Sequence, residues 1–101
     1  MVYVSASSAV EAERIARVLL DERLVACVNI VNPVYSLFHW DGKVESAEEC
    51  LLIMKSSTDL FAVLESRIRV LHSYDVPEII AIPVVFGSNG YLDWIRSVLK
   101  N

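Results

Sequence analysis

The chain has 101 residues, of which 54% are hydrophobic and 22% charged, and its formal net charge is −4 at pH 7. This length suits one domain over residues 1–101, because no Pro/Gly/Ser-rich linker divides the chain. Its nine basic residues form no clustered stripe, which argues against a nucleic-acid-binding protein. There is no apolar run of ~18 residues and no basic region before an apolar stretch, so we expect neither a membrane span nor a signal peptide.

The first third of the chain predicts a strand, a helix and a second strand. Residues 2–4 read as a short strand, and Ser8 with Glu11 forms a Ser-x-x-Glu capping box at a helix start. Apolar residues then recur at helical spacing, at Ala12, Ile15, Ala16, Leu19 and Leu20. Residues 26–31 are apolar on nearly every position, which is typical of a central strand.

A long hairpin follows. Asp41-Gly42 is a two-residue turn signal between an arm over residues 34–40 and a return strand over residues 43–55. The arms could reach roughly 40 Å at ~3.3 Å per residue. Such an exposed apolar arm is a liability unless a second chain covers it, so it predicts an oligomer. The alternative is a hairpin that folds back at Pro33 onto its own domain.

The second half predicts a helix, a strand and a final helix. Ser57 or Thr58 caps the first of these helices, residues 78–83 form the strand, and Asn89 caps the last helix. The order is therefore β-α-β-β-α-β plus a C-terminal helix. This order is an α+β, ferredoxin-like (split β-α-β) plan with a long β-hairpin arm.

The stretch between the second helix and the last strand contains several side chains that could bind a ligand or a metal ion. These are His72, Tyr74, Asp75 and Glu78. They surround Pro77, which forces an extended chain. Two interpretations are open. The turn holds an imidazole, a phenol and carboxylates at the end of a sheet, a usual position for a binding site. Alternatively, His72 ends a helix and satisfies its last carbonyls and its dipole.

The same stretch resembles the His-Pro-Tyr-(acidic)-Val-Pro-Glu-Ile signature of the CutA divalent-cation tolerance family, with Ser73 in place of the usual proline. Residues 22–30, 40–45 and 91–95 resemble three further family segments, in family order. The resemblance implies the ferredoxin-like fold, a homotrimer in which strands pair between subunits, and a role in tolerance of divalent metal ions such as copper.

Metal ligands are expected among His, Cys and carboxylate side chains that converge in space. The candidates are His72, Cys27 and Glu78, and the resemblance places His72 at the signature histidine. Some family members with a proposed copper site also use a first-strand cysteine, where this chain has Val4, and Leu71 stands before His72 instead of a second histidine. A thiolate-and-histidine copper site is therefore incomplete, and we expect only weak copper binding as a cofactor interaction.

A ligand pocket is the other possibility, with Trp40, Lys55, Tyr74 and Asp75 as its candidate residues. No nucleophile elbow or phosphate loop occurs, so we assign no catalytic residue and expect no enzyme. The alternative function is a PII-like trimeric signalling protein that binds a small molecule, by fold analogy. A third possible function is that of a purely structural assembly scaffold. Two cysteines without CxxC spacing favour reduced thiols and a cytoplasmic protein.

Overall fold

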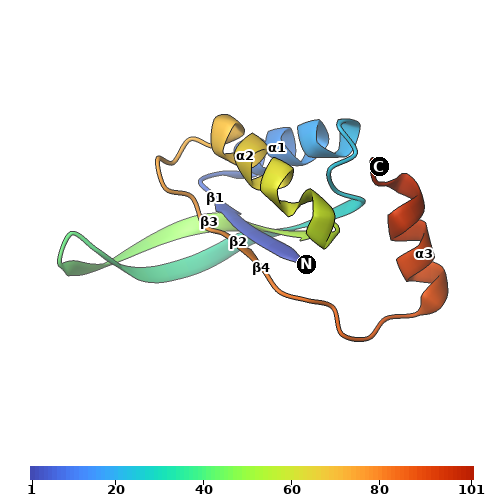
Figure 1. Ribbon diagram of the computed structural model, residues 1–101. Helices are drawn as coiled ribbons and strands as arrows, with labels where there is room; N and C mark the ends of the chain where they lie inside the picture. Colours follow the sequence, from blue (N-terminus) through green and yellow to red (C-terminus); the bar gives the residue numbers. More distant parts are fainter.

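The computed structural model describes residues 1–101 as a four-stranded antiparallel sheet with three α-helices and a short 3-10 helix (Figure 1). Its elements are β1 (Val2–Ala6), α1 (Ala9–Asp21), β2 (Cys27–Trp40), β3 (Lys43–Lys55), η1 (Thr58–Leu60), α2 (Phe61–Leu71), β4 (Ile79–Ala81) and α3 (Asn89–Val98). The strands lie in the order β2-β3-β1-β4, and α1 and α2 lie side by side over one face of the sheet (Figure 1). The predicted ferredoxin-like plan is confirmed.

The core lies between that face and the two helices. Strand residues alternate between the two faces, so Val4 and its β3 partner Leu52 both point toward the helices and are fully buried. α1 contributes Ile15 and α2 contributes Leu64, both with no exposed surface. The helical periodicity of the sequence therefore marked the residues that build this layer.

Both ends of α1 follow from local chemistry. The Ser8 side chain accepts the Glu11 backbone N–H at 3.1 Å, which is the predicted N-cap. At the other end Arg23 has φ 58°, and the Leu24 N–H donates to the Leu19 carbonyl at 3.0 Å. This left-handed residue turns the chain out of the helix and toward β2.

β2 and β3 form the long arm that the sequence predicts. Asp41 and Gly42 both have positive φ, 55° and 78°, as a two-residue hairpin turn requires. The ladder shifts register between Val31 and Val34, around the cis Asn32–Pro33 bond, but the chain does not fold back there. The arm instead projects from the sheet (Figure 1), and its large apolar side chains are exposed: Tyr35 71%, Leu37 66%, Trp40 65% and Val44 67%.

The region after α2 differs from the prediction. β4 has three residues rather than six, because its partner β1 ends: Ala81 pairs with Val2, and only Met1 remains beyond it. Residues 82–88 continue as an extended segment toward α3 (Figure 1) with exposed apolar side chains, among them Val85 at 76% and Phe86 at 92%. Ser88, not Asn89, is the N-cap residue of α3.

The C-terminal end of the chain returns to the core. α3 has no buried residue, but Leu99 after it is buried, and the Lys100 N–H donates to the Arg23 carbonyl at 2.9 Å. Both cysteines are free, with Cys50 buried and Cys27 half-buried. None of the helices combines the length and the hydropathy needed to cross a bilayer.

Candidate functional site

His72 lies directly after α2, and its imidazole is fully enclosed. The Tyr74 backbone N–H donates to its Nδ1 at 3.0 Å, and its Nε2 lies 2.7 Å from the Ser5 carbonyl oxygen. A backbone N–H can only donate and a carbonyl can only accept, so Nδ1 carries the lone pair and Nε2 carries the proton. The fold therefore holds a neutral imidazole with both ring nitrogens in hydrogen bonds.

Glu11 connects this turn to α1. Its carboxylate accepts the Ser7 N–H at 3.0 Å, the Ser7 hydroxyl at 2.8 Å and the Ser73 N–H at 2.8 Å. Burial disfavours the charge, but the hydrogen bonds from Ser73 and Ser7 outweigh it and lower the pKa of Glu11 to about 2. Oε2 of this carboxylate is 4.0 Å from Nδ1 of His72. A buried, ionised carboxylate therefore holds the backbone of the turn through its hydrogen bonds.

Tyr74 connects the turn to the arm. Its hydroxyl donates to Oε2 of Glu49 on β3 at 2.9 Å, and its ring lies 4.7 Å from the His72 ring, centroid to centroid. Burial, then the hydrogen bond and the charge of Glu49, raise the pKa of Tyr74 to about 12. On the helix side, the Arg14 guanidinium donates to the Leu71 carbonyl at 3.0 Å at the end of α2. α1, β1, β3 and α2 therefore all hold this one turn.

A cavity of about 470 Å³ opens beside the turn. It is lined by Ser66, Arg69, Val70, His72, Ser73, Tyr74 and Asp75. Two predicted pocket residues, Tyr74 and Asp75, meet there. Because the His72 side chain has no exposed surface, that imidazole does not reach the solvent in the cavity.

The other predicted site residues lie elsewhere in the single chain. Cys27 pairs in register with Lys55, whereas Ser5, the partner of His72, pairs with Leu51. These positions are four residues apart along β3, roughly 13 Å. Burial, and after it the influence of Cys27, raise the pKa of Tyr91 on α3.

The arm tip is farther away still. Trp40 pairs with Lys43, roughly 40 Å along β3 from Lys55. Glu78 directly precedes β4 and is exposed. Within one chain, no three His, Cys, Asp or Glu side chains come close enough to hold a metal ion.

Sequence reasoning missed the roles of Glu11, Ser7 and Glu49. The capping box indicated Glu11, but in an ordinary box its carboxylate returns to the N-cap N–H. Here it reaches one residue further back, to Ser7, and across to Ser73. No local pattern predicts a contact with a residue 62 positions away.

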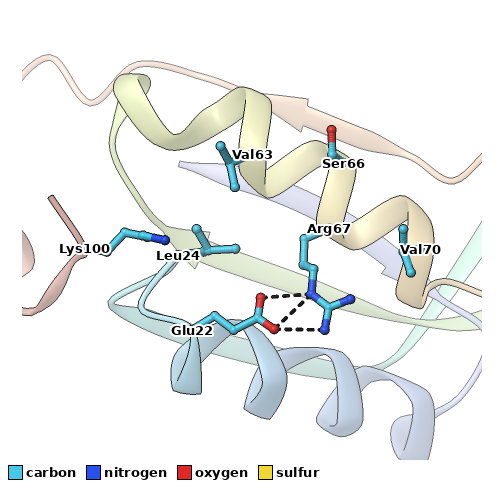
Figure 2. A pocket seen from close by; sticks show the side chains of 7 residues that line it. All are labelled: Glu22, Leu24, Val63, Ser66, Arg67, Val70 and Lys100. Carbon is cyan, nitrogen blue, oxygen red and sulfur yellow. Dashed lines mark hydrogen bonds and ion pairs between the residues drawn. The ribbon is translucent and has the colours of Figure 1, made fainter.

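A second cavity of about 450 Å³ lies over α2 and is shown in Figure 2. The Arg67 guanidinium binds the Glu22 carboxylate through Nε and Nη2, each 2.9 Å from an oxygen, while Lys100 approaches from the C-terminal tail. The hydrogen bond from Arg67 lowers the pKa of Glu22. Leu24, Val63 and Val70 supply its apolar walls.

Comparison with known proteins covers nearly the whole chain. The family model described as "CutA1 divalent ion tolerance protein" matches residues 1–98. The divalent-cation tolerance protein CutA of Thermus thermophilus is 44% identical over 96 residues, which are 95% of this chain and 93% of that protein.

Solved structures agree in fold. The Thermus thermophilus structure has a TM-score of 0.96 at 42% identity and covers 98% of this chain and 96% of its own. A structure from Archaeoglobus fulgidus, described as a periplasmic divalent cation tolerance protein CutA, has a TM-score of 0.95 at 43% identity and the same coverage.

Proposed function

Because the chain belongs to the CutA1 divalent ion tolerance family, we propose that it acts in tolerance of divalent metal ions, copper first, as a homotrimeric metal-binding protein. The observation that carries this proposal is the family match over residues 1–98. We assign it no catalytic step.

The open edges of the sheet support self-assembly. β2 and β4 lie at the two edges of the sheet, and each continues into a segment rich in exposed apolar side chains. An edge that pairs with the opposite edge of the next copy forms a head-to-tail contact, and such contacts form a ring when the rotation between copies closes. Closure covers both edges and both apolar segments, which removes the aggregation liability of a lone chain. The proposed number of three subunits is taken from the resemblance to the family.

Metal binding in this proposal is weak and of low selectivity. One chain offers no cluster of ligands, so a site takes donors from two subunits or from the acidic side chains of the arm, Glu45, Glu48 and Glu49. His72 remains the predicted imidazole ligand. Metal at His72 must displace the Tyr74 N–H from Nδ1 or replace the proton on Nε2, and both changes disturb the turn.

Calorimetric titration tests the proposal directly. Cu(II), Zn(II) and ATP are titrated separately into the intact protein and into a His72→Ala variant. His39→Ala is the matched control, because His39 is the only other histidine and is exposed on the arm. Saturable Cu(II) binding, stronger than Zn(II) binding, is expected. Loss of Cu(II) binding in His72→Ala, but not in His39→Ala, would identify His72 as a copper ligand.

Other outcomes separate the alternatives. Saturable ATP binding without metal binding supports the PII-like signalling function and overturns this proposal. Copper binding that is equal in all three proteins would exclude both histidines as copper ligands and leave the carboxylates of the arm as the candidate ligands. Cells that lack the protein should grow less well in excess copper if the tolerance role is correct. We further propose a cytoplasmic location, which fractionation tests against the periplasm named for the Archaeoglobus fulgidus relative.

A further inference from the structure

The start of α3 contains a dipeptide that occurs only once in this chain. Asn89 is followed by Gly90, and it is the only one of the asparagines that precedes a glycine. Both residues are exposed. A glycine has no side chain to shield its backbone nitrogen, so the asparagine side chain can approach that nitrogen closely.

The local structure leaves this nitrogen free. The first backbone hydrogen bond of α3 runs from the Leu92 N–H to the Ser88 carbonyl at 3.0 Å. The Gly90 N–H lies before this bond and is one of the donors that a helix leaves unpaired at its start. Ser88 is the N-cap residue, but its side chain makes no capping hydrogen bond. The first turn of α3 is therefore open to fraying.

We propose that Asn89-Gly90 is a site of spontaneous deamidation in the folded protein. Hydroxide removes the Gly90 amide proton, and the nitrogen attacks Cγ of Asn89. The bond from Cγ to Nδ2 breaks, ammonia leaves and a five-membered succinimide forms. Water then opens either carbonyl to give aspartate or isoaspartate. The net change is one amide and one water converted into one carboxylate and one ammonium ion, without oxidation or reduction.

The product changes the helix that carries it. An aspartate at the first position of α3 places a negative charge at the positive end of the helix dipole, at a terminus that has no side-chain cap. Isoaspartate instead adds a methylene to the backbone and interrupts the first turn. Deamidation thus converts an uncapped helix start into either a charged start or a broken one.

The first experiment incubates the folded wild-type protein at mildly alkaline pH and separates charge forms by isoelectric focusing, with the modified residue located by peptide mass mapping. Gly90→Ala is the matched control, because a Cβ on Gly90 meets no atom within 4 Å and the backbone needs no positive φ there. The expected result is a more acidic form modified at residue 89, lost in Gly90→Ala. Absence of this form in the folded protein, when the same chain in denaturant produces it, overturns the proposal.

A second experiment tests the consequence for α3. Hydrogen exchange is compared between the wild type, Asn89→Asp and Asn89→Gln, where Gln supplies a neutral side chain of similar polarity. Slower exchange over α3 in Asn89→Asp alone is expected. Equal exchange in all three proteins overturns the stabilising role of the new carboxylate.

Discussion

The Glu11 carboxylate accepts the backbone N–H of Ser73 at 2.8 Å, across 62 residues of sequence. This bond joins the first turn of α1 to the turn between α2 and β4. The other oxygen of the same carboxylate accepts two bonds from Ser7. The Glu11 side chain therefore holds two backbone segments in place, the one at Ser7 before α1 and the one at Ser73 after α2.

Glu11→Gln should lower the free energy of unfolding by about 1–3 kcal/mol, because the amide NH2 faces a donor and leaves it unpaired. Chemical denaturation at neutral pH measures this loss. The control is Glu13→Gln on the same helix, where the carboxylate forms only an exposed ion pair with Arg17 and the loss should be much smaller. Equal losses in both variants would contradict the special role of Glu11.

The pH dependence of stability provides a separate test. The pKa of Glu11 falls from 4.5 to about 2 on folding. The folded state thus binds the proton less tightly, so the stabilisation is complete above pH 4.5 and is lost as the pH falls toward 2. The difference in unfolding free energy between wild type and Glu11→Gln should shrink over this window. A difference that is constant down to pH 2 would assign the effect to packing.

Tyr74→Phe removes the hydrogen bond to Glu49 and should lower the unfolding free energy by about 1 kcal/mol. The pKa of Tyr74 rises to about 12 on folding, so its contribution is full below pH 10 and is lost between pH 10 and 12. Ultraviolet titration of the phenols should lose its highest step in this variant. Tyr35→Phe, on an exposed residue, should leave that step in place.

Arg23→Gly should raise the unfolding free energy by up to about 1 kcal/mol. Arg23 has φ 58°, a conformation that is strained for residues with a Cβ and free of strain for glycine. Arg23→Ala is the control, since alanine keeps the Cβ and should give no gain. Thermal denaturation compares the three proteins, and an equal gain in both variants would show that removal of the Arg side chain, rather than of its Cβ, is responsible.

Trp40→Glu and Phe86→Glu should each weaken self-association, because they place a carboxylate on the arm and on the segment after β4 that we propose to be covered. Light scattering over a concentration series measures the assembly against the monomer mass of 11.3 kDa. Val10→Glu is the control, because this valine of α1 is also an exposed apolar residue, at 81%, but lies outside both segments. A wild-type protein that stays monomeric at micromolar concentration would overturn the assembly itself.

The sequence predicted features whose causes are local. Asp41-Gly42 set the turn, and the return strand begins at Lys43 and ends at Lys55, as predicted. The last strand was predicted too long, because its length depends on where its neighbour β1 ends and the pattern of residues 82–86 is equally apolar.

The candidate site was harder to predict, because its contacts join distant segments. His72 was identified correctly as the residue that ends α2, but its ring bonds to Ser5 of β1 rather than to the last carbonyls of its helix. Cys27 was predicted as a further metal ligand, but within one chain it pairs with Lys55 of β3, whereas Ser5, the partner of His72, pairs with Leu51. Whether His72 binds metal stays a prediction for the titrations above.

β1 lies inside the sheet, between β3 and β4, although it is the first element of the chain. Val2 therefore gains a partner on one edge only when Met54 has been made, and on the other edge only when Ala81 has been made. At ~5–20 residues per second, a ribosome needs roughly 3–10 s to go from Val2 to Met54 and roughly 4–16 s to go from Val2 to Ala81. Until Met54 is made, β1 is an apolar strand with two unpaired edges, and only α1 is available to cover one of its faces. Synthesis, and not only assembly, thus exposes an apolar strand of this domain to aggregation.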